Sequence, residues 1–269
     1  MRITASILKL LYRPAPYSHK GQNGILCVVG GSEKYHGAPL LAIKAASRFV
    51  DLVYFHSPAK LDEKILLKLK SKSNCFIAVP KRDLFKTIEK SDCMLVGNGL
   101  EVNSENKRLV NTLLKRFAKT KKMVLDAGAL RMADKKLFSK NVLVTPHSLE
   151  FEVLFGANAS PEEAKRQAHK WNCVILLKQR FCFVTEGKNV WKNANGNEGM
   201  TKGGTGDVLA GLCAAFACKN DLLSSAQAAA FVNGFTGDVL YAIQGSRFDA
   251  DDLAESVAFA FNQALEEKR

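Results

Sequence analysis

The chain has 269 residues, of which 47% are hydrophobic and 24% are charged. This balance supplies apolar material for a full core and excludes a largely disordered chain, and the length is ordinary for a single α/β domain over residues 1–269. The net charge of +13 favours anionic partners, but its sign alone does not choose among nucleic acid, acidic lipid and phosphorylated small molecules.

The cysteines and the lengths of the apolar segments limit the cellular compartment and the kinds of partner that we expect. The seven cysteines include no Cys-x-x-Cys pair and lie mostly in apolar stretches, which predicts reduced thiols and a cytoplasmic location. The first apolar run is too short for a signal peptide, and no segment approaches about 18 uninterrupted apolar residues, so no membrane partner is expected.

The basic residues do not form one long arm interleaved with aromatic side chains, as in a dedicated nucleic-acid surface. Many lysines occur instead in short groups: Lys68, Lys70 and Lys72; Lys119, Lys121 and Lys122; Lys135 and Lys136. We interpret these groups as solvated helix faces and turns, and we expect no nucleic-acid partner.

Short apolar runs alternate with longer helical patterns over the first half of the chain. The runs lie at residues 25–30, 52–55, 75–79, 93–97, 123–126 and 141–145, and the helical patterns at 39–48 and 104–117. Strands that are apolar on both faces and alternate with helices are typical of a parallel sheet buried between helix layers. Such sheets bind ligands at the carboxyl ends of their strands.

The pattern changes after Trp171. Three closely spaced runs, at residues 173–178, 181–185 and 189–193, predict an antiparallel edge. Helices are then expected at 206–218, 224–242 and 251–266, the last capped by Asp249. The predicted fold class is therefore α/β, with a mostly parallel central sheet, helices on both faces and a small antiparallel edge.

Turns that suit a ligand site follow four of the predicted strands. They are Gly30-Gly31-Ser32, Gly97-Asn98-Gly99, Asp126-Ala127-Gly128 and Thr145-Pro146-His147. Each one alone is typical of a tight turn between strand and helix. Because all four follow parallel strands, we expect them to line one crevice.

The strongest local signal lies at residues 196–211, GNEGMTKGGTGDVLAG. Gly203, Gly204 and Gly206 permit positive φ and close backbone approach, and the following helix directs its free N–H groups at the loop, which is typical of a phosphate cradle. The Lys-Ser/Thr of a P-loop is missing. Asp207, in the first helical turn, is either a helix cap or a base that takes a proton from an attacking hydroxyl.

The string GMTKGGTGDVLAG, residues 199–211, resembles the GMAxGGxGDVLxG signature of the NAD(P)H-hydrate dehydratases, which belong to the ribokinase-like superfamily. Segments 18–42, 96–100, 124–130 and 144–151 match the same family in the same order. Together these segments cover most of the chain from Ser18 to Gly211.

The chain departs from the family pattern at five positions. Asn98 and Glu101 stand in GNGLE, where the family usually has Gly-Pro-Gly-Leu-Gly. Gln179 and Cys182 stand in LKQRFC, where the family has a glycine and a downstream threonine, and Glu198 stands where proline is common. Gln179 and Cys182 fall where proteins of the family contact the adenine nucleotide.

The resemblance implies an enzyme that uses ADP or ATP, with Mg²⁺, to dehydrate (S)-NAD(P)H hydrate to NAD(P)H. Asp207 would be the catalytic base. Residues that would contact the hydrate are Ala38, Gly99, His147 and Asp207. Residues that would contact the nucleotide are Lys178, Gln179, Arg180, Phe181, Cys182, Asn195, Gly203, Gly204 and Gly206. Metal ligands are unknown, and a homo-oligomer is implied, with a tetramer favoured.

Other interpretations stay open from the sequence. A small-molecule kinase of the same superfamily, acting on a vitamin precursor or a sugar, would use the same glycine loop and aspartate. A non-catalytic nucleotide-binding protein is a second alternative. His147 has an alternative role as a helix-start residue, and Lys178 as a strand-end lysine whose head reaches solvent.

Overall fold

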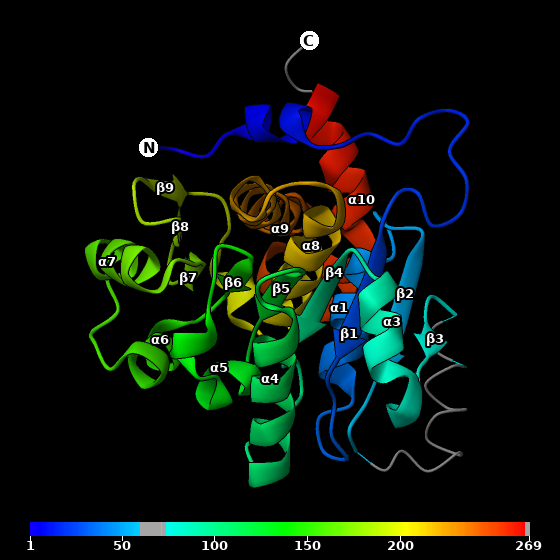
Figure 1. Cartoon of the computed structure of the whole chain (residues 1–269). Helices are drawn as coiled ribbons and strands as arrows, with labels where there is room; N and C mark the ends of the chain where they lie inside the picture. The colour runs from blue at the N-terminus through cyan, green and yellow to red at the C-terminus, as the bar shows by residue number, and fades with distance from the viewer. Residues whose placement is uncertain (60–70, 72–73, 267–269) are drawn as a thin grey trace.

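A sheet of nine strands runs through the computed structural model, which describes residues 1–59, 71 and 74–266 (Figure 1). The strand order is β3-β2-β1-β4-β5-β6-β7-β8-β9. Pairs from β3 to β7 are parallel, whereas β8 and β9 add antiparallel strands at one edge. The predicted fold class is confirmed. The lysine group at Lys68, Lys70 and Lys72 lies outside the described residues.

The strands lie close to the predicted apolar runs. Their bounds are β1 Ile25–Val29, β2 Leu52–His56, β3 Ile77–Ala78, β4 Cys93–Val96, β5 Lys122–Leu125, β6 Val142–Val144, β7 Val174–Lys178, β8 Cys182–Thr185 and β9 Val190–Asn193. Only β3 is much shorter than its predicted run, 75–79. It pairs with β2 alone at the sheet edge, and Ile77 is 46% exposed, so little burial supports a longer strand there.

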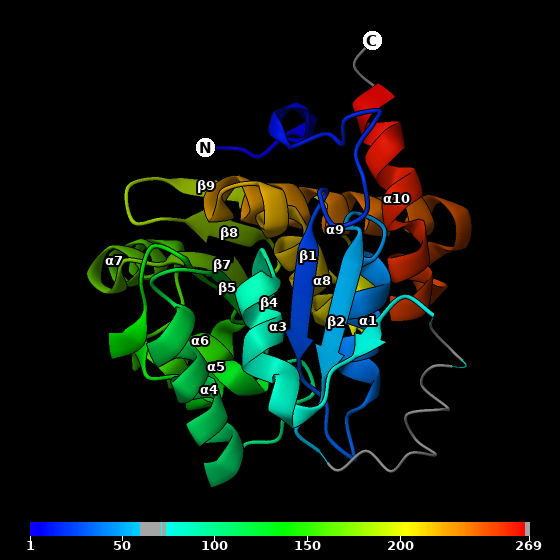
Figure 2. The same cartoon turned by 45° about the vertical axis from the view of Figure 1, so that its right-hand side comes forward.

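Helices cover both faces of the sheet (Figure 2). One face packs against α1 Gly37–Ala46, α8 Thr205–Lys219, α9 Leu222–Gln244 and α10 Ala250–Glu266. The other packs against α3 Leu84–Lys90, α4 Ser104–Phe117, α5 Gly128–Met132, α6 Ser148–Phe155 and α7 Pro161–Trp171. Strand residues alternate between the two cores, so that Leu26 and Val28 belong to one and Cys27 and Val29 to the other, as the pleat requires.

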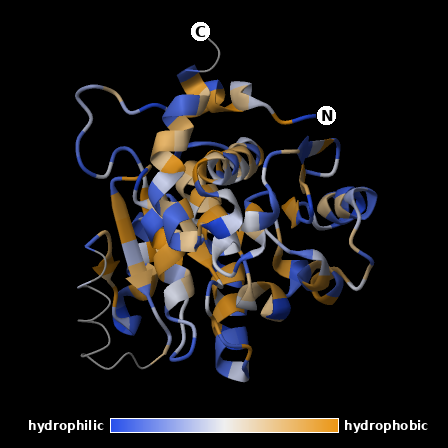
Figure 3. Ribbon diagram, turned by 180° about the vertical axis from the view of Figure 1, so that it is seen from behind, coloured by the Kyte–Doolittle hydropathy of each residue, from blue (hydrophilic) through white to orange (hydrophobic). Residues whose placement is uncertain are grey.

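The helix predictions hold for five helices, and the sequence pattern missed α3, α5, α6 and α7. The predicted cap of the last helix is confirmed, because the Asp249 carboxylate accepts from the N–H groups of Asp251 (2.9 Å) and Asp252 (3.0 Å). The apolar residues concentrate on the strands and on the helix faces that meet them (Figure 3). Across the described ranges, no helix has the length and apolarity that crossing a membrane requires. None of the seven cysteines forms a disulfide.

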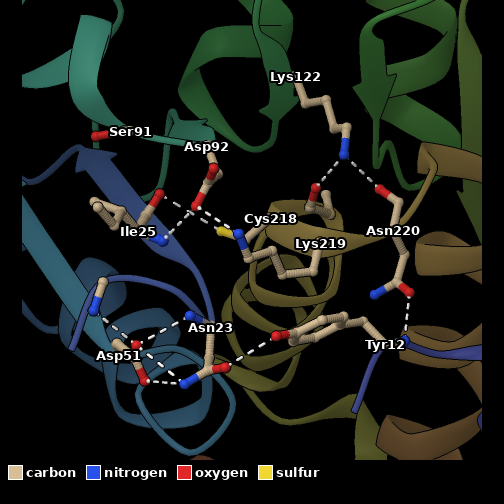
Figure 4. A network of polar contacts seen from close by, with 12 residues as sticks. Tyr12, Asn23, Ile25, Asp51, Ser91, Asp92, Lys122, Cys218, Lys219 and Asn220 are labelled. Atoms are coloured by element: carbon tan, nitrogen blue, oxygen red, sulfur yellow. Dashed lines mark hydrogen bonds and ion pairs between the residues drawn. The ribbon is translucent and has the colours of Figure 1, made fainter. Parts of the chain in front are cut away.

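Polar contacts fasten the amino-terminal segment across the amino ends of the strands (Figure 4). The Tyr12 N–H donates to Asn220 at 2.7 Å, and the Tyr12 hydroxyl donates to Asn23 at 3.0 Å. The Lys122 ammonium donates to the carbonyls of Ala217 (2.9 Å) and Asn220 (2.7 Å) at the end of α8, where carbonyl groups lack helical partners. These contacts hold α8 at the end opposite its amino terminus.

Helix α8 lies against α1 with no space for a side chain at Gly211. A Cβ there would come within 2.3 Å of the Ala42 carbonyl oxygen. Residues 208–218 of α8 are all buried, so the helix cannot move outward without disturbing the core.

We expect Gly211→Ala to lower the free energy of unfolding by about 1–3 kcal/mol, because the overpacking outweighs the better helix propensity of alanine. Gly37→Ala is the matched control: Gly37 also lies in α1, and a Cβ there meets nothing within 4 Å, so its stability should stay equal or rise slightly. Urea unfolding followed by circular dichroism measures both. Equal stabilities of the two variants would contradict the close packing of α1 and α8.

Candidate functional site

The turns after β1 and β4 lie in direct backbone contact. The Gly31 N–H donates to the Asn98 carbonyl at 2.8 Å. A Cβ at Gly99, whose φ is +71°, would lie 2.2 Å from the Tyr35 carbonyl oxygen. Only glycine allows this approach, because any side chain would collide with the neighbouring backbone. Ala38 lies in the first turn of α1 and is partly buried. The residue that follows it, Pro39, lies next to the glycines of both turns.

Helix α8 begins at the same end of the sheet. Gly204 precedes it in the left-handed region at φ +97°, and a Cβ there would lie 2.6 Å from Leu41 and 2.7 Å from Ala250. Among the described residues, no hydrogen bond from the Gly206 N–H is found. This free N–H at a helix amino terminus suits an anion.

The Asp207 side chain does not cap its own helix. Its Oδ1 accepts instead from the Asn98 amide at 2.6 Å, across the site. The structure therefore disfavours the capping alternative for Asp207 and places its carboxylate against the turn after β4.

Asp126, after β5, is the centre of a buried polar cluster. It is 2% exposed, and its Oδ1 accepts from the Lys178 ammonium and from the Thr145 hydroxyl, both at 2.8 Å. Its Oδ2 accepts from Asn98 at 3.0 Å. The Lys178 ammonium also lies 3.9 Å from Glu150. Lys178 thus points inward to carboxylates, and the alternative of a lysine that reaches solvent does not hold.

The pKa of Asp207 is raised from 3.8 to about 7. Burial is the largest cause and the nearby charges of Asp126 and Glu150 act in the same direction, while the Asn98 hydrogen bond and Lys178 act in the opposite direction. Burial also tends to lower the pKa of Lys178, but Asp126 and Glu150 outweigh it and raise that pKa overall. At neutral pH the site therefore holds a permanent cation beside a carboxylate that titrates near the working pH, the property expected of a general base.

His147 begins helix α6. Its Nδ1 accepts from the Glu150 N–H at 3.3 Å, and the Glu150 carboxylate accepts from the His147 N–H at 2.9 Å. This is a reciprocal capping box, so the helix-start role is real. The imidazole remains half exposed, while the backbone of His147 pairs with that of Lys178. Contact of the imidazole with a substrate stays a prediction.

A pocket of about 430 Å³ adjoins the cluster between β7, β8, α8 and α9. Of the residues predicted to bind nucleotide, six line it: Lys178, Gln179, Arg180, Cys182, Asn195 and Gly206. Phe181, Gly203 and Gly204 are not among its lining residues. The Phe181 ring instead lies 3.7 Å from the Lys192 ammonium, and the Gln179 amide donates to Ser148 (3.1 Å) and to the Ala159 carbonyl (3.3 Å).

Several residues of the site were not assigned a role from the sequence. Asp126 stands in a predicted turn at the end of an apolar run, which places it at the site without giving it a chemical role. Asn98 also stands in such a turn, where it departs from the family pattern, and it likewise has no predicted role. Asn233, in α9, lines the pocket with no local signal, because it lies far along the chain from the motif. Across the described part of the chain, no group of three or more His, Cys, Asp or Glu side chains could hold a metal ion.

The raised pKa of Asp207 has a consequence for stability. The folded chain binds this proton more tightly than the unfolded chain does, so stability falls as pH rises from 3.8, the ordinary pKa of an aspartate, to about 7. Asp207→Asn removes this loss, and we expect the variant to be more stable than the wild type at pH 8, by at most about 4 kcal/mol, with little difference near pH 4.

Urea unfolding at both pH values measures the effect. Asp221→Asn is the control, because Asp221 caps α9 from the other end of the molecule, and asparagine caps equally well. If Asp207→Asn is no more stable than wild type at pH 8, the pKa of Asp207 is not raised by burial as we describe.

Comparisons with known proteins identify the family of this chain. A family model described as NAD(P)H-hydrate dehydratase matches residues 26–258. The chain is 36% identical over 277 residues to the ADP-dependent (S)-NAD(P)H-hydrate dehydratase of Nitrosopumilus maritimus, covering 95% of this chain and 94% of that protein. It is 35% identical over 256 residues to the bifunctional NAD(P)H-hydrate repair enzyme of Methanocaldococcus jannaschii, covering 93% of this chain and 50% of that protein.

The chain thus spans about half the length of the bifunctional relatives it matches. Solved structures show the same fold. A ribokinase-like superfamily protein from Enterococcus faecalis gives a TM-score of 0.88 at 22% identity, covering 98% of this chain and 95% of that one. The ADP/ATP-dependent NAD(P)H-hydrate dehydratase of Bacillus subtilis, co-crystallized with ATP/Mg²⁺, gives 0.80 at 21% identity, covering 98% of both chains. The chain belongs to the NAD(P)H-hydrate dehydratase family.

Proposed function

We propose that this chain dehydrates (S)-NAD(P)H hydrate to NAD(P)H, with ADP or ATP as the phosphoryl donor. The observation that carries the proposal is the Asp207 carboxylate, which titrates near neutral pH beside a glycine-bounded helix terminus and a pocket large enough for part of a nucleotide. The Nitrosopumilus maritimus relative, similar along nearly its whole length, is named for this reaction with ADP.

The chemistry needs activation because hydroxide is a poor leaving group at neutral pH. Asp207 removes the proton of the ring hydroxyl, and the oxygen attacks the terminal phosphoryl group of the nucleotide, whose bond to the departing AMP or ADP breaks. The ring nitrogen lone pair then expels phosphate, and a proton leaves the neighbouring ring carbon to restore the dihydronicotinamide. Asp207 returns its proton to solvent.

The other residues divide between the two substrates. We assign Ala38, Gly99 and His147 to the hydrate from the resemblance, and the turn that carries Gly99 contacts Asp207 through Asn98. Gly206, which has a free N–H, and Lys178, which carries an ammonium group, line the pocket, and both groups suit the transferring phosphoryl group. We also assign to nucleotide binding four residues that line the pocket: Gln179, Arg180, Cys182 and Asn195. For Phe181, Gly203 and Gly204, contact with the nucleotide is a prediction from the resemblance alone.

Mg²⁺ would neutralise the phosphate charges during the transfer. The described residues offer it no cluster of ligating side chains, so we assign it no protein ligand and propose that it enters with the nucleotide. A homo-oligomer, with a tetramer favoured, and a cytoplasmic location also remain predictions.

The assay is incubation of the chain with hydrated NADH, Mg²⁺ and either ADP or ATP, following the return of nicotinamide absorbance and the release of phosphate. We expect Asp207→Asn to lower turnover by roughly 10²- to 10⁴-fold, the usual worth of a positioned general base, with nucleotide affinity little changed. Asp221→Asn should turn over like wild type. Near wild-type turnover in Asp207→Asn would contradict the assignment of the base.

The same assay separates the alternative functions. A kinase for a small molecule would leave phosphate on its product, so a phosphoester retained without phosphate release would favour it. Binding of ADP without any turnover would favour a non-catalytic nucleotide-binding protein.

The nucleotide pocket supplies a second test. Burial raises the pKa of the Cys182 thiol to about 11, so at neutral pH this position offers the ligand only a weak hydrogen-bonding group. We expect ADP to bind more tightly to a Gln179→Gly, Cys182→Thr variant than to wild type. Calorimetry on the double variant and on each single variant would locate the effect. Equal affinities in all four proteins would show that β7 and β8 contact the nucleotide through backbone alone.

A further inference from the structure

Asn98 joins two carboxylates through one nitrogen atom. Its side chain is 0% exposed, and its Nδ2 donates to Asp126 Oδ2 at 3.0 Å and to Asp207 Oδ1 at 2.6 Å. An amide nitrogen carries two hydrogens, one for each carboxylate. Both donors of Asn98 are therefore committed to acidic groups of the site.

The two carboxylates depend on Asn98 to different degrees. Asp126 also accepts from the Lys178 ammonium and the Thr145 hydroxyl. Among the described residues, the Asn98 amide is the one hydrogen-bond donor to the Asp207 side chain. Loss of this amide would leave Asp126 with two partners and Asp207 with none among the described residues.

We propose that Asn98 is a positioning residue, which holds Asp207 Oδ1 against the turn after β4 and favours the ionised form of this carboxylate beside Asp126. The consequence for the reaction rests on the proposed role of Asp207 as base. With Oδ1 held, Oδ2 is the oxygen left to accept the hydroxyl proton. No hydrogen bond to Oδ2 is found among the described residues.

The charges that face Asp207 explain why a donor is needed there. Asp126, from the turn after β5, and Glu150, from α6, repel a charge on Asp207, and burial disfavours it more than either. Lys178, from β7, and Asn98 oppose these effects, and the pKa comes to about 7. Lys178 forms its short ion pair with Asp126, so Asn98 is the group in direct contact with Asp207. A hydrogen bond to the charged form favours ionisation.

The backbone of Asn98 has a separate role, since its carbonyl accepts from the Gly31 N–H at 2.8 Å. Side-chain variants keep this contact. Asn98→Leu preserves the branched shape and removes both donors. Asn98→Pro also removes them and suits the local backbone, because Gly97 precedes it and no hydrogen bond from the Asn98 N–H is found among the described residues. Either variant can answer the question if the other fails to fold.

The first measurement is independent of activity. The Asp207 carboxyl carbon is titrated by NMR in chain labelled with ¹³C-aspartate, and its signal is assigned by its loss in Asp207→Asn. We expect the midpoint to rise by about 1 to 2 pH units in Asn98→Leu and Asn98→Pro, the worth of one hydrogen bond to a charged group. The matched control is Asn111→Leu, which removes amide bonds to the carbonyls of Lys107 and Met132 on the α4 side and should leave the midpoint in place.

The second measurement is the pH profile of kcat/KM. We expect the acid limb to move upward with the NMR midpoint, so that kcat/KM falls about 10-fold or more below pH 7 and much less at high pH. A merely structural role would lower the rate at every pH alike. An unmoved NMR midpoint in a folded variant would overturn the proposal. A moved midpoint with an unmoved acid limb would support the role of Asn98 and contradict Asp207 as the base.

Discussion

Two acidic side chains, Asp126 and Asp207, share a partly enclosed site with one lysine and one amide, and much of the structure serves to keep them there. Like charges in a place that excludes water repel each other strongly unless donors and cations surround them. Lys178, Thr145 and Asn98 supply these donors. The balance leaves Asp207 close to its point of titration at neutral pH, where a carboxylate can both take and release a proton.

This cluster depends on how closely the backbone turns approach one another. Parallel neighbours β1, β4, β5, β6 and β7 end at one edge of the sheet, and glycines after β1 and β4 let the turns touch. The buried amide of Asn98 then reaches Asp126 and Asp207 together. A single side chain larger than hydrogen at Gly97 or Gly99 would separate these turns and so the carboxylates.

Helix α8 connects the site to the rest of the molecule. Its amino terminus presents Gly206 and Asp207, its middle packs against α1 at Gly211, and its last carbonyls accept from Lys122. The helix is buried along almost its whole length. Core packing therefore fixes the position of Asp207, which would be less well defined on a loop. The carboxylate of Asp207 is therefore held in a fixed place within the site.

The sequence by itself determined the parallel sheet, its antiparallel edge and the glycine loop before Asp207, because strand periodicity, glycine turns and helix starts are local properties of the chain. Through resemblance it also predicted that Lys178 and Cys182 lie in a strand that binds nucleotide. Only the tertiary structure decided that Asn98 bridges two carboxylates, that Lys178 points inward and that Asn233 lines the pocket. These contacts join residues far apart in the chain, and no local pattern records which distant side chain will fill a shared space.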